Sequence, residues 1–282
     1  MSGFKEKFWQ AVFLLTACVS IAAVVLICVY LLGNGIPTIF EIGFSNFFGT
    51  TWKPSQDLYG ILPMIVGSVY ATAGAIIVGV PIGLLCAIYL ARFCPKAIYR
   101  VLKPAIDLMA GIPSIVYGFF GLMVIVPVIQ DLTGTSGKNL LTASLLLGIM
   151  ILPTIVSVAE SSLRAVPESY YEGSLALGAT HERSVFATVV PAATSGVMSA
   201  VILGVERAIG ETMAVIMIAG NQPVMPTSIL KGLRTMTANI VLEMGYASGL
   251  HREALIATGV VLFVFILIIN ICFSLMKGRG SR

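Results

Sequence analysis

The chain has 282 residues, of which 57% are hydrophobic and only 11% are Asp, Glu, Lys or Arg, and its formal net charge is +4. An ordinary soluble domain has about 25% charged residues, so this chain has too few to cover a water-exposed surface. The composition therefore excludes a soluble globular enzyme, a disordered tail and a disulfide-stapled secreted module. It predicts an integral membrane protein.

Seven uncharged runs of 19 or more residues divide the chain. About 20 apolar residues cross a bilayer as a helix, which satisfies its own backbone in lipid. The fifth and sixth runs are separated only by residues 206–211, too few to leave the membrane and return. We therefore expect an all-α membrane protein with six spans in one transmembrane domain, residues 1–282. The expected spans are residues 9–32, 62–91, 106–130, 140–163, 190–220 and 254–276.

The distribution of Lys and Arg predicts the orientation. With the N-terminus inside, eleven of these residues fall in inner segments and five in outer segments. Inner loops carry the excess of positive charge, so both termini are expected in the cytoplasm. The net charge is thus interpreted as a topology signal rather than a nucleic-acid-binding surface. The inner residues are Lys5, Lys7, Arg92, Lys96, Arg100, Lys103, Arg164, Arg183, Lys277, Arg279 and Arg282, and the outer ones are Lys53, Lys138, Lys231, Arg234 and Arg252.

Three connecting segments have recognisable character. Residues 33–60 form an outer segment whose aromatic residues are typical of an interfacial belt, with a docking surface for an external partner as the alternative. Residues 92–104 are expected to be a short basic inner loop. Residues 221–253 are expected to be a longer outer segment, with a short surface or re-entrant helix within 228–244. The aromatic residues of the first segment include Phe44, Phe47, Phe48 and Trp52.

The longest inner segment, residues 164–190, lies between the fourth and fifth spans. The spacing of Tyr171 and Leu175 indicates a short helix, and Gly178 then interrupts the pattern. We expect two short helices joined at this glycine and lying under the membrane. On periodicity alone, an amphipathic interfacial connector without further function is the favoured interpretation.

A charge cluster interrupts the expected fifth span. Arg207 lies about 24 Å along a helix from Pro191 and about 20 Å from Gly220, which is deep in the bilayer. Charges at that depth are costly and mark functional candidates. On a continuous helix Arg207 and Glu211 would share one face and could pair, whereas Glu206 needs a partner on a neighbouring helix or subunit. Structural adhesion between helices is the alternative role.

The residue types in this cluster suit an oxyanion. A guanidinium stays charged and presents paired N–H donors that match oxyanion geometry. Glu211 would hold Arg207 while the site is empty and weaken its grip on the substrate, because a transport site must release what it binds. Gly204 and Gly210 flank the cluster and would allow close helix contact.

The inner segment also has a specific spacing. Glu172 is followed by two small residues, by Gly178 six positions later, and by a Val-Pro pair ending at Pro191. This pattern resembles the EAA signature of binding-protein-dependent ABC importer permeases, with glycine and serine where alanines are usual. The resemblance implies the type I ABC importer permease fold. It also implies that a coupling helix containing Glu172, Gly178 and Ala179 sits in a cleft of an ATP-binding subunit.

Three further motifs narrow the resemblance. Residues 111–121 contain Pro113 and three glycines, which alone indicate only a kinked, closely packed helix. Together with residues 207–214 and 57–60, they resemble the PstC-type permeases of high-affinity phosphate ABC importers over nearly the whole chain. The resemblance implies translocation of inorganic phosphate across a bacterial or archaeal cytoplasmic membrane. In that family, residues matching Arg207 and Glu211 are associated with phosphate translocation, and Glu206 is a further candidate.

The resemblance also implies partners. These are a second, homologous permease subunit, two ATP-binding subunits and an extracytoplasmic phosphate-binding protein. No P-loop is expected here, because the candidate at residues 134–139 has the wrong glycine spacing. ATP and Mg²⁺ are therefore expected on the partner subunits, with no cofactor in this chain.

No catalytic residue and no metal site are expected in the chain. His181 and His251 fall in expected loops, and His181 lacks the second histidine of a zinc-protease motif. The cysteines suggest neither disulfides nor zinc. A permease for another oxyanion and an ion-coupled carrier are the alternatives, although a carrier would show more spans and internal repeats. An intramembrane enzyme would need a nucleophile or metal set, which is missing.

Overall fold

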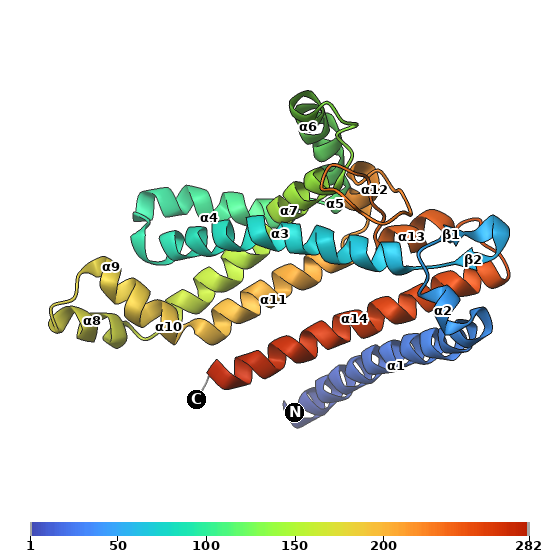
Figure 1. Ribbon diagram of the computed structural model, residues 1–282. Helices are drawn as coiled ribbons and strands as arrows, with labels where there is room; N and C mark the ends of the chain where they lie inside the picture. Colours follow the sequence, from blue (N-terminus) through green and yellow to red (C-terminus); the bar gives the residue numbers. More distant parts are fainter. Residues whose placement is uncertain (1, 281–282) are drawn as a thin grey trace.

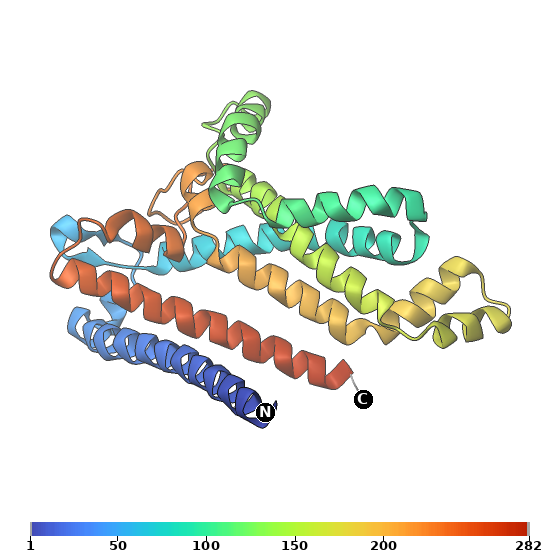
Figure 2. The ribbon, with the colours of Figure 1, turned by 180° about the vertical axis from the view of Figure 1, so that it is seen from behind.

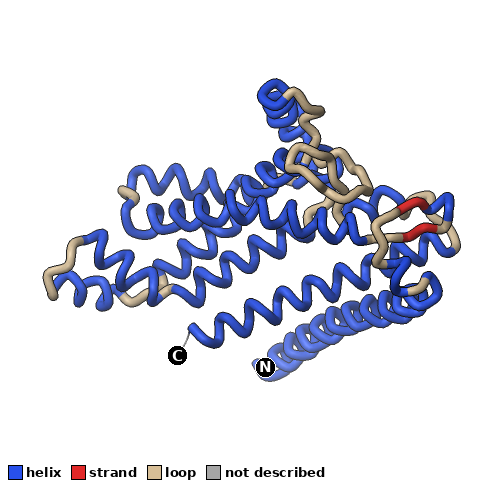
Figure 3. Tube along the Cα trace, in the orientation of Figure 1, coloured by secondary structure: helices blue, strands red, loops and turns tan. Residues whose placement is uncertain are grey.

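The computed structural model describes residues 2–280, and helices make up most of it (Figures 1 and 3). The helices are α1 (Ser2–Ile42), α2 (Phe44–Phe47), α3 (Leu62–Ile88), α4 (Lys96–Ala110), α5 (Ser114–Phe120), α6 (Val126–Thr133), α7 (Leu140–Arg164), α8 (Glu168–Ala176), α9 (His181–Ser184), α10 (Val190–Ala192), α11 (Thr194–Gly210), α12 (Met213–Ile218), α13 (Met236–Glu243) and α14 (Leu250–Gly280). Wide π-helical turns at Tyr89–Phe93, Gly121–Ile125 and Val185–Val189 extend α3, α5 and α9. A hairpin pairs β1 (Trp52–Lys53) with β2 (Leu58–Tyr59).

Within the described residues, five helical segments are long and apolar enough to cross a membrane, and a sixth counts if a bent pair is one span. The five are Lys5–Ile42, Leu62–Phe93, Ser114–Thr133, Leu140–Arg164 and Leu250–Leu275. The bent pair joins His181–Ala192 to Thr194–Gly210 at 72°. The expected all-α class is confirmed, and α7 matches the expected fourth span almost end to end.

The central packing involves α3, α7 and α11. Glycines on α3 allow close approach: a Cβ added at Gly79 would lie 2.7 Å from the carbonyl oxygen of Gly148, and one at Gly83 would lie 2.9 Å from Ile155. The apolar face of α7, which includes Leu146 and Ile151, is fully buried here. Small residues thus place α7 within contact of both neighbours, which fixes the position of α11 and its charge cluster.

The two terminal helices, α1 and α14, lie side by side along one edge of the molecule (Figure 2). α1 continues past the expected end of the first span at residue 32, through Gly35 to Ile42. A Cβ at Gly35 would lie 3.1 Å from the Cα atom of Ala257, so this glycine permits the close approach to α14. The outward side chains of α1, such as Phe13 and Leu26, are exposed and apolar, as a lipid-facing helix requires.

The third span differs from the expectation of a helix over 106–130, and the expected loop over 92–104 is wrong. α4 occupies much of that loop, and the chain breaks at Gly111–Pro113 before α5 begins. Proline disfavours helix in the preceding residue and lacks an N–H donor, which explains the break. Beyond it, α6 turns away from α3 and α7 (Figure 1).

Of the charges that suggested a loop, Lys96, Arg100 and Lys103 lie at helical spacing on one face of the amphipathic helix α4. On this face, Lys103 Nζ is 3.3 Å from Glu160 Oε2 on α7. Val101 and Leu108 on its other side are 70% and 74% exposed. Lys103 thus connects α4 to α7, and the apolar side chains on the other side face outward.

The aromatic residues of the 33–60 segment do not form a simple belt. Phe47 and Trp52 are buried in a core with the ends of α13 and α14, whereas Phe44 is exposed. The belt interpretation is therefore wrong for Phe47 and Trp52. The hairpin instead closes over this end of the helices. In the 228–244 stretch, the expected short helix is confirmed as α13.

Glu243 lies at the centre of a buried polar cluster at this end. Its carboxylate accepts a hydrogen bond from Trp52 Nε1 at 2.9 Å and lies 2.5 Å from Arg234 Nη1. His251 Nε2 is 2.8 Å away. One carboxylate thus connects the hairpin, the loop before α13, α13 itself and α14. Nothing local in the sequence indicates this cluster.

We expect Glu243→Leu to destabilise the purified importer by about 3–5 kcal/mol, because it leaves Arg234 buried without its ion-pair partner. The measurement is the midpoint of thermal unfolding in detergent. Glu253→Leu, which changes an exposed carboxylate on α14, is the matched control and should shift stability by no more than about 0.5 kcal/mol. Equal midpoints for the two variants would contradict a structural role for Glu243.

Candidate functional site

Arg207 lies in the last turn of α11 and is half-buried. Its guanidinium Nη1 donates a hydrogen bond to Thr154 Oγ1 of α7 at 2.9 Å. Gly204, one turn earlier, allows this contact, since a Cβ there would lie 2.8 Å from Ile155. The ion pairs formed by residues 2–280 do not include Arg207. Its charge is therefore not neutralised by a carboxylate in the part of the chain that is described.

The predicted pairing of Arg207 with Glu211 on one helix face is wrong. α11 ends at Gly210, and Glu211 is extended, with φ −68° and ψ 130°. The Glu211 carboxylate instead accepts a hydrogen bond from the backbone N–H of Ala214 at 3.3 Å, at the start of α12. A side-chain acceptor there satisfies a free helical N–H. A Cβ added at Gly210 would have no neighbour within 4 Å, so this glycine does not permit the close helix contact that was expected.

Glu206 is half-buried beside Arg207 and makes no hydrogen bond or ion pair among the described residues. The partner expected for it on a neighbouring helix is thus not found in residues 2–280. Glu206 and Arg207 lie near the end of α11, and Glu211 lies in the break between α11 and α12. Irregular backbone at membrane depth occurs only where it is buried in protein or lines an aqueous cavity.

The glycine-rich motif of residues 111–121 packs against the same region. A Cβ at Gly118 of α5 would lie 2.8 Å from the Cα atom of Ala214 on α12. Tyr117 is buried and donates its hydroxyl to the carbonyl of Met109 at 2.9 Å, which bridges the break between α4 and α5. The prediction of a kinked and closely packed helix is confirmed, and its contact is the helix that follows Glu211.

The inner segment forms two short helices, α8 and α9, joined through Gly178, whose φ is +85°. This confirms the expected pair of helices and explains the glycine, because other residues rarely adopt that conformation. Glu172 and Gly178 are exposed, and Ala179 is half-buried. Leu177 is 91% exposed, although it is apolar. The turn therefore presents a protruding apolar side chain.

Several contacts hold this turn in shape. The Tyr171 hydroxyl and His181 Nδ1 are 2.7 Å apart, and the Thr180 hydroxyl accepts from the backbone N–H of Arg183. His181 is thus half-buried in the first turn of α9, not the solvated loop residue that was expected. The carboxylate of Glu182 accepts hydrogen bonds from the backbone N–H of Glu182 itself and from the side chain of Thr180, and these bonds lower its pKa.

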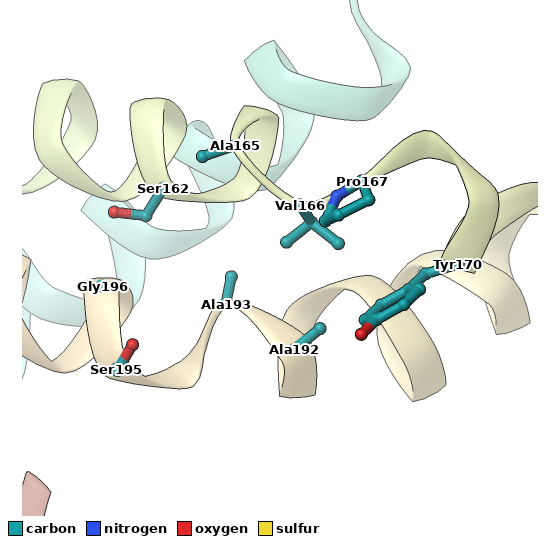
Figure 4. A pocket seen from close by; sticks show the side chains of 9 residues that line it. All are labelled: Ser162, Ala165, Val166, Pro167, Tyr170, Ala192, Ala193, Ser195 and Gly196. Carbon is teal, nitrogen blue, oxygen red and sulfur yellow. The ribbon is translucent and has the colours of Figure 1, made fainter. Parts of the chain in front are cut away.

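A cavity of about 400 Å³ lies where this segment meets the bent helix pair (Figure 4). Its walls come from the end of α7, the start of α8 and the bend at Ala193. The lining residues are Ser162, Ala165, Val166, Pro167, Tyr170, Ala192, Ala193, Ser195 and Gly196. The 72° bend next to this open space connects the α8–α9 turn directly to α11, which carries Arg207.

Comparison with known proteins places the chain in a family. The family described as "Binding-protein-dependent transport system inner membrane component" matches residues 79–279. The chain is 38% identical over 278 residues to the probable ABC transporter permease protein YqgH of Bacillus subtilis, covering 94% of this chain and 90% of that protein. It is 34% identical over 298 residues to the phosphate transport system permease protein PstC of Haemophilus influenzae, covering 98% and 92%.

The fold is also similar to a solved structure. A chain of the MetNI methionine ABC transporter in an inward-facing conformation superimposes with a TM-score of 0.65 and 20% identity, over 82% of this chain and 100% of that chain. This likeness supports the type I permease fold. Members of the matched family are transport subunits rather than enzymes. The chain therefore belongs to the binding-protein-dependent inner membrane components, the membrane-spanning permease subunits of ABC importers.

Proposed function

We propose that this chain is the permease subunit of an ATP-driven importer that moves inorganic phosphate across the cytoplasmic membrane of a bacterium or archaeon. The observation that carries the proposal is Arg207, a half-buried guanidinium next to a break in its span, with Thr154 as its hydrogen-bond partner. The similarity to phosphate transport permeases at 34% identity supports the same substrate. YqgH, whose name specifies no substrate, leaves a permease for another oxyanion as the second candidate.

Arg207 can provide the attractive part of the site. One guanidinium nitrogen is bound to Thr154, and the remaining N–H groups are free to donate to a phosphate oxygen. Charge-assisted hydrogen bonds of this kind are stronger than neutral ones. Because no carboxylate competes for Arg207 within residues 2–280, the incoming oxyanion is the partner that neutralises it.

Glu206 and Glu211 would provide discrimination and release. Hydrogen phosphate keeps an O–H group at neutral pH, and this group can donate a hydrogen bond to a carboxylate. Sulfate has only acceptor oxygens. A carboxylate close to the path therefore accepts a hydrogen bond from phosphate and repels sulfate. The same negative charge limits how tightly Arg207 holds the substrate. Glu211 acts in this proposal from its position at the start of α12 and not as a helix-face partner of Arg207.

The proposed assembly follows from the family and the position of each surface. Members of this family associate with ATP-binding subunits and a substrate-binding protein. We assign the α8–α9 turn, with Glu172, Gly178 and Ala179, to one of two ATP-binding subunits, which hold ATP and Mg²⁺. A second, homologous permease completes the path, and a phosphate-binding protein delivers substrate onto residues 33–60 and 221–253. Six spans with both termini in the cytoplasm complete this arrangement.

Transport would be a population shift between two packings of the spans. Nucleotide binding draws the two inner turns together, and the bend at Ala193 passes this motion into α11. The Arg207 region then changes from outward to inward access. Membership in the ABC permease family argues against the alternative of an ion-coupled carrier, because ATP hydrolysis on partner subunits supplies the free energy for transport.

Uptake by cells tests the proposed substrate. A strain that lacks this permease should recover uptake of labelled phosphate at limiting concentration when the chain is supplied with its partner subunits. Excess arsenate, which also carries an O–H group, should compete, and excess sulfate should not. Restored uptake of sulfate, or no recovery of phosphate uptake although the complex is assembled, would overturn the proposal.

We expect Thr154→Val to lower phosphate uptake up to about tenfold, because Arg207 loses the hydrogen bond that orients it. Thr154→Ser keeps the hydroxyl and is the matched control, with uptake near that of the natural chain. The measurement is initial uptake rate at equal membrane levels of the complex. Similar rates for Val and Ser would show that orientation by Thr154 does not matter.

A further inference from the structure

A second polar cavity, of about 440 Å³, lies away from the proposed substrate path. It is formed where the π-helical end of α3 turns into α4, next to the end of α7. Four basic residues line it, Arg92, Lys96, Arg100 and Arg164, together with Tyr99, and the lining contains no acidic residue. Arg164 is nearly three helical turns beyond Thr154 on α7, roughly 15 Å along the axis. The cavity is therefore separate from Arg207.

Two of the basic side chains are held in fixed positions. The Arg164 guanidinium lies over the ring of Tyr99, 4.4 Å from its centroid, donates to the carbonyl of Leu90 at 2.7 Å, and pairs with Glu160. Arg92 donates to the carbonyl of Leu163 at 3.2 Å. Ordered guanidinium groups present their remaining donors without the entropic cost of ordering flexible side chains.

Arg92 has an unsatisfied donor. Its side chain is 10% exposed, and its Nη1 pairs with Glu168 of α8 at 2.8 Å. Its Nε–H is buried and has no hydrogen-bond partner. Buried N–H groups are nearly always satisfied in native proteins, so this orphan leaves Arg92, a residue of the cavity wall, with an unmet donor.

The local charge is not balanced. Glu160 is shared between Lys103 and Arg164, and Glu168 pairs with Arg92. Lys96 and Arg100 form no ion pair among residues 2–280 and are exposed at the mouth of the cavity. α4 also begins here, at Lys96, without a side-chain cap, so the free N–H groups of its first turn add partial positive charge.

The surroundings identify the source of the anion. Ile98 and Val101, on the same helix as Lys96 and Arg100, are 45% and 70% exposed and apolar, as expected of a surface that faces lipid. With both termini in the cytoplasm, as proposed above, the cavity lies at the cytoplasmic membrane surface. That leaflet carries the anionic lipids that basic pockets at helix ends recognise. We propose that this cavity binds the phosphate group of an anionic phospholipid.

The bound lipid has a structural consequence. A phosphate group in the cavity neutralises the surplus positive charge around Arg92, which stabilises the arrangement in which Arg92 pairs with Glu168. Glu168 is the first residue of α8, so the lipid positions the inner turn assigned to the ATP-binding subunit. The inference uses the proposed orientation of the chain and is independent of which oxyanion is transported.

The test uses the complete importer purified in detergent and titrated with phosphatidylglycerol, with bound lipid counted by native mass spectrometry. The variant is Lys96→Gln with Arg100→Gln, which removes two exposed charges and leaves the ion pairs of Arg92 and Arg164 intact. We expect phosphatidylglycerol to bind about 30-fold more weakly, as two basic residues at a membrane surface predict. Lys5→Gln with Lys7→Gln, exposed on α1, is the charge-matched control and should bind as the natural chain does.

Three outcomes decide the proposal. Weaker binding of phosphatidylglycerol by the first variant alone, with no change for phosphatidylcholine, supports it. Equal binding by the two variants overturns it. Saturable binding of inorganic phosphate to the lipid-free complex, lost in the first variant, shows that free phosphate is the ligand and overturns the lipid assignment. None of these measurements depends on phosphate transport.

Discussion

Arg207→Gln should lower ATP-driven uptake of phosphate by about 10- to 100-fold while the importer assembles normally. Glutamine keeps a polar side chain but removes the charge, and a hydrogen bond to a charged group contributes about 1.5–3 kcal/mol. Each 1.4 kcal/mol corresponds to about a tenfold change. Uptake is measured at limiting phosphate with equal membrane levels of the complex.

Two further variants sharpen this experiment. Arg207→Lys retains the charge but cannot present paired donors, so its uptake should fall between that of the natural chain and that of Arg207→Gln. Lys7→Gln, an exposed lysine on α1, is the control for loss of one positive charge and should transport normally. Normal uptake by Arg207→Gln would make the charge cluster an adhesive between helices, the alternative that the sequence left open.

The second large effect is expected at the inner turn. Glu172→Lys should reduce coupled phosphate uptake by about 30-fold or more, because we expect Glu172 to be a hot spot of the interface, and such residues contribute about 2 kcal/mol or more to binding. Glu172 is exposed on α8, and Leu177 beside it is an apolar side chain with 91% exposure, as expected of a surface that a partner covers. The measurements are uptake and copurification of the ATP-binding subunits with a tagged permease.

The control for Glu172→Lys carries the same charge change elsewhere. Glu6→Lys, on the exposed start of α1, should leave both uptake and copurification unchanged. If Glu172→Lys behaves like Glu6→Lys, the α8–α9 turn is not the contact with the ATP-binding subunit. Loss of uptake with normal copurification would instead indicate that the turn binds its partner but fails to transmit motion.

The parts of the fold that the sequence predicts are those with a local cause. α7 covers the uncharged run of residues 139–159 and continues for about one more turn to Arg164, and Asn139 caps its first turn by accepting from the backbone N–H of Thr142. Gly178 joins two short helices because its left-handed conformation suits glycine. A kink at Pro113 was predicted because proline lacks an N–H donor, although the structure goes further and breaks the expected third span there. In each case a few neighbouring residues determine the outcome.

Features that depend on distant residues were not predictable. The charged residues of α4 are typical of a loop in the sequence, because the ion pair between Lys103 and Glu160 on α7 forms only in the folded chain. Glu243 binds Arg234, which is 9 residues away in the sequence, and Trp52, which is 191 residues away. Such contacts form only when the helices pack, so no window of sequence reveals them.

The charge cluster has one feature that the sequence predicts and one that depends on distant packing. The residue types indicated a polar site at membrane depth, and the structure places Arg207 and Glu206 together at a break in the span. The predicted pairing with Glu211 was wrong because it assumed that the helix continues through Gly210. Whether a helix continues there depends on the packing of α12 against α5, where Gly118 meets Ala214.

Reconstitution of the complete importer tests the central claim most directly. Liposomes that contain this permease, its partner permease and the ATP-binding subunits, with ATP inside and the phosphate-binding protein outside, should accumulate labelled phosphate. Accumulation should require both ATP and the binding protein, and excess sulfate should not reduce it. An assembled importer that hydrolyses ATP but accumulates no phosphate, or that accumulates sulfate equally well, would contradict the assignment.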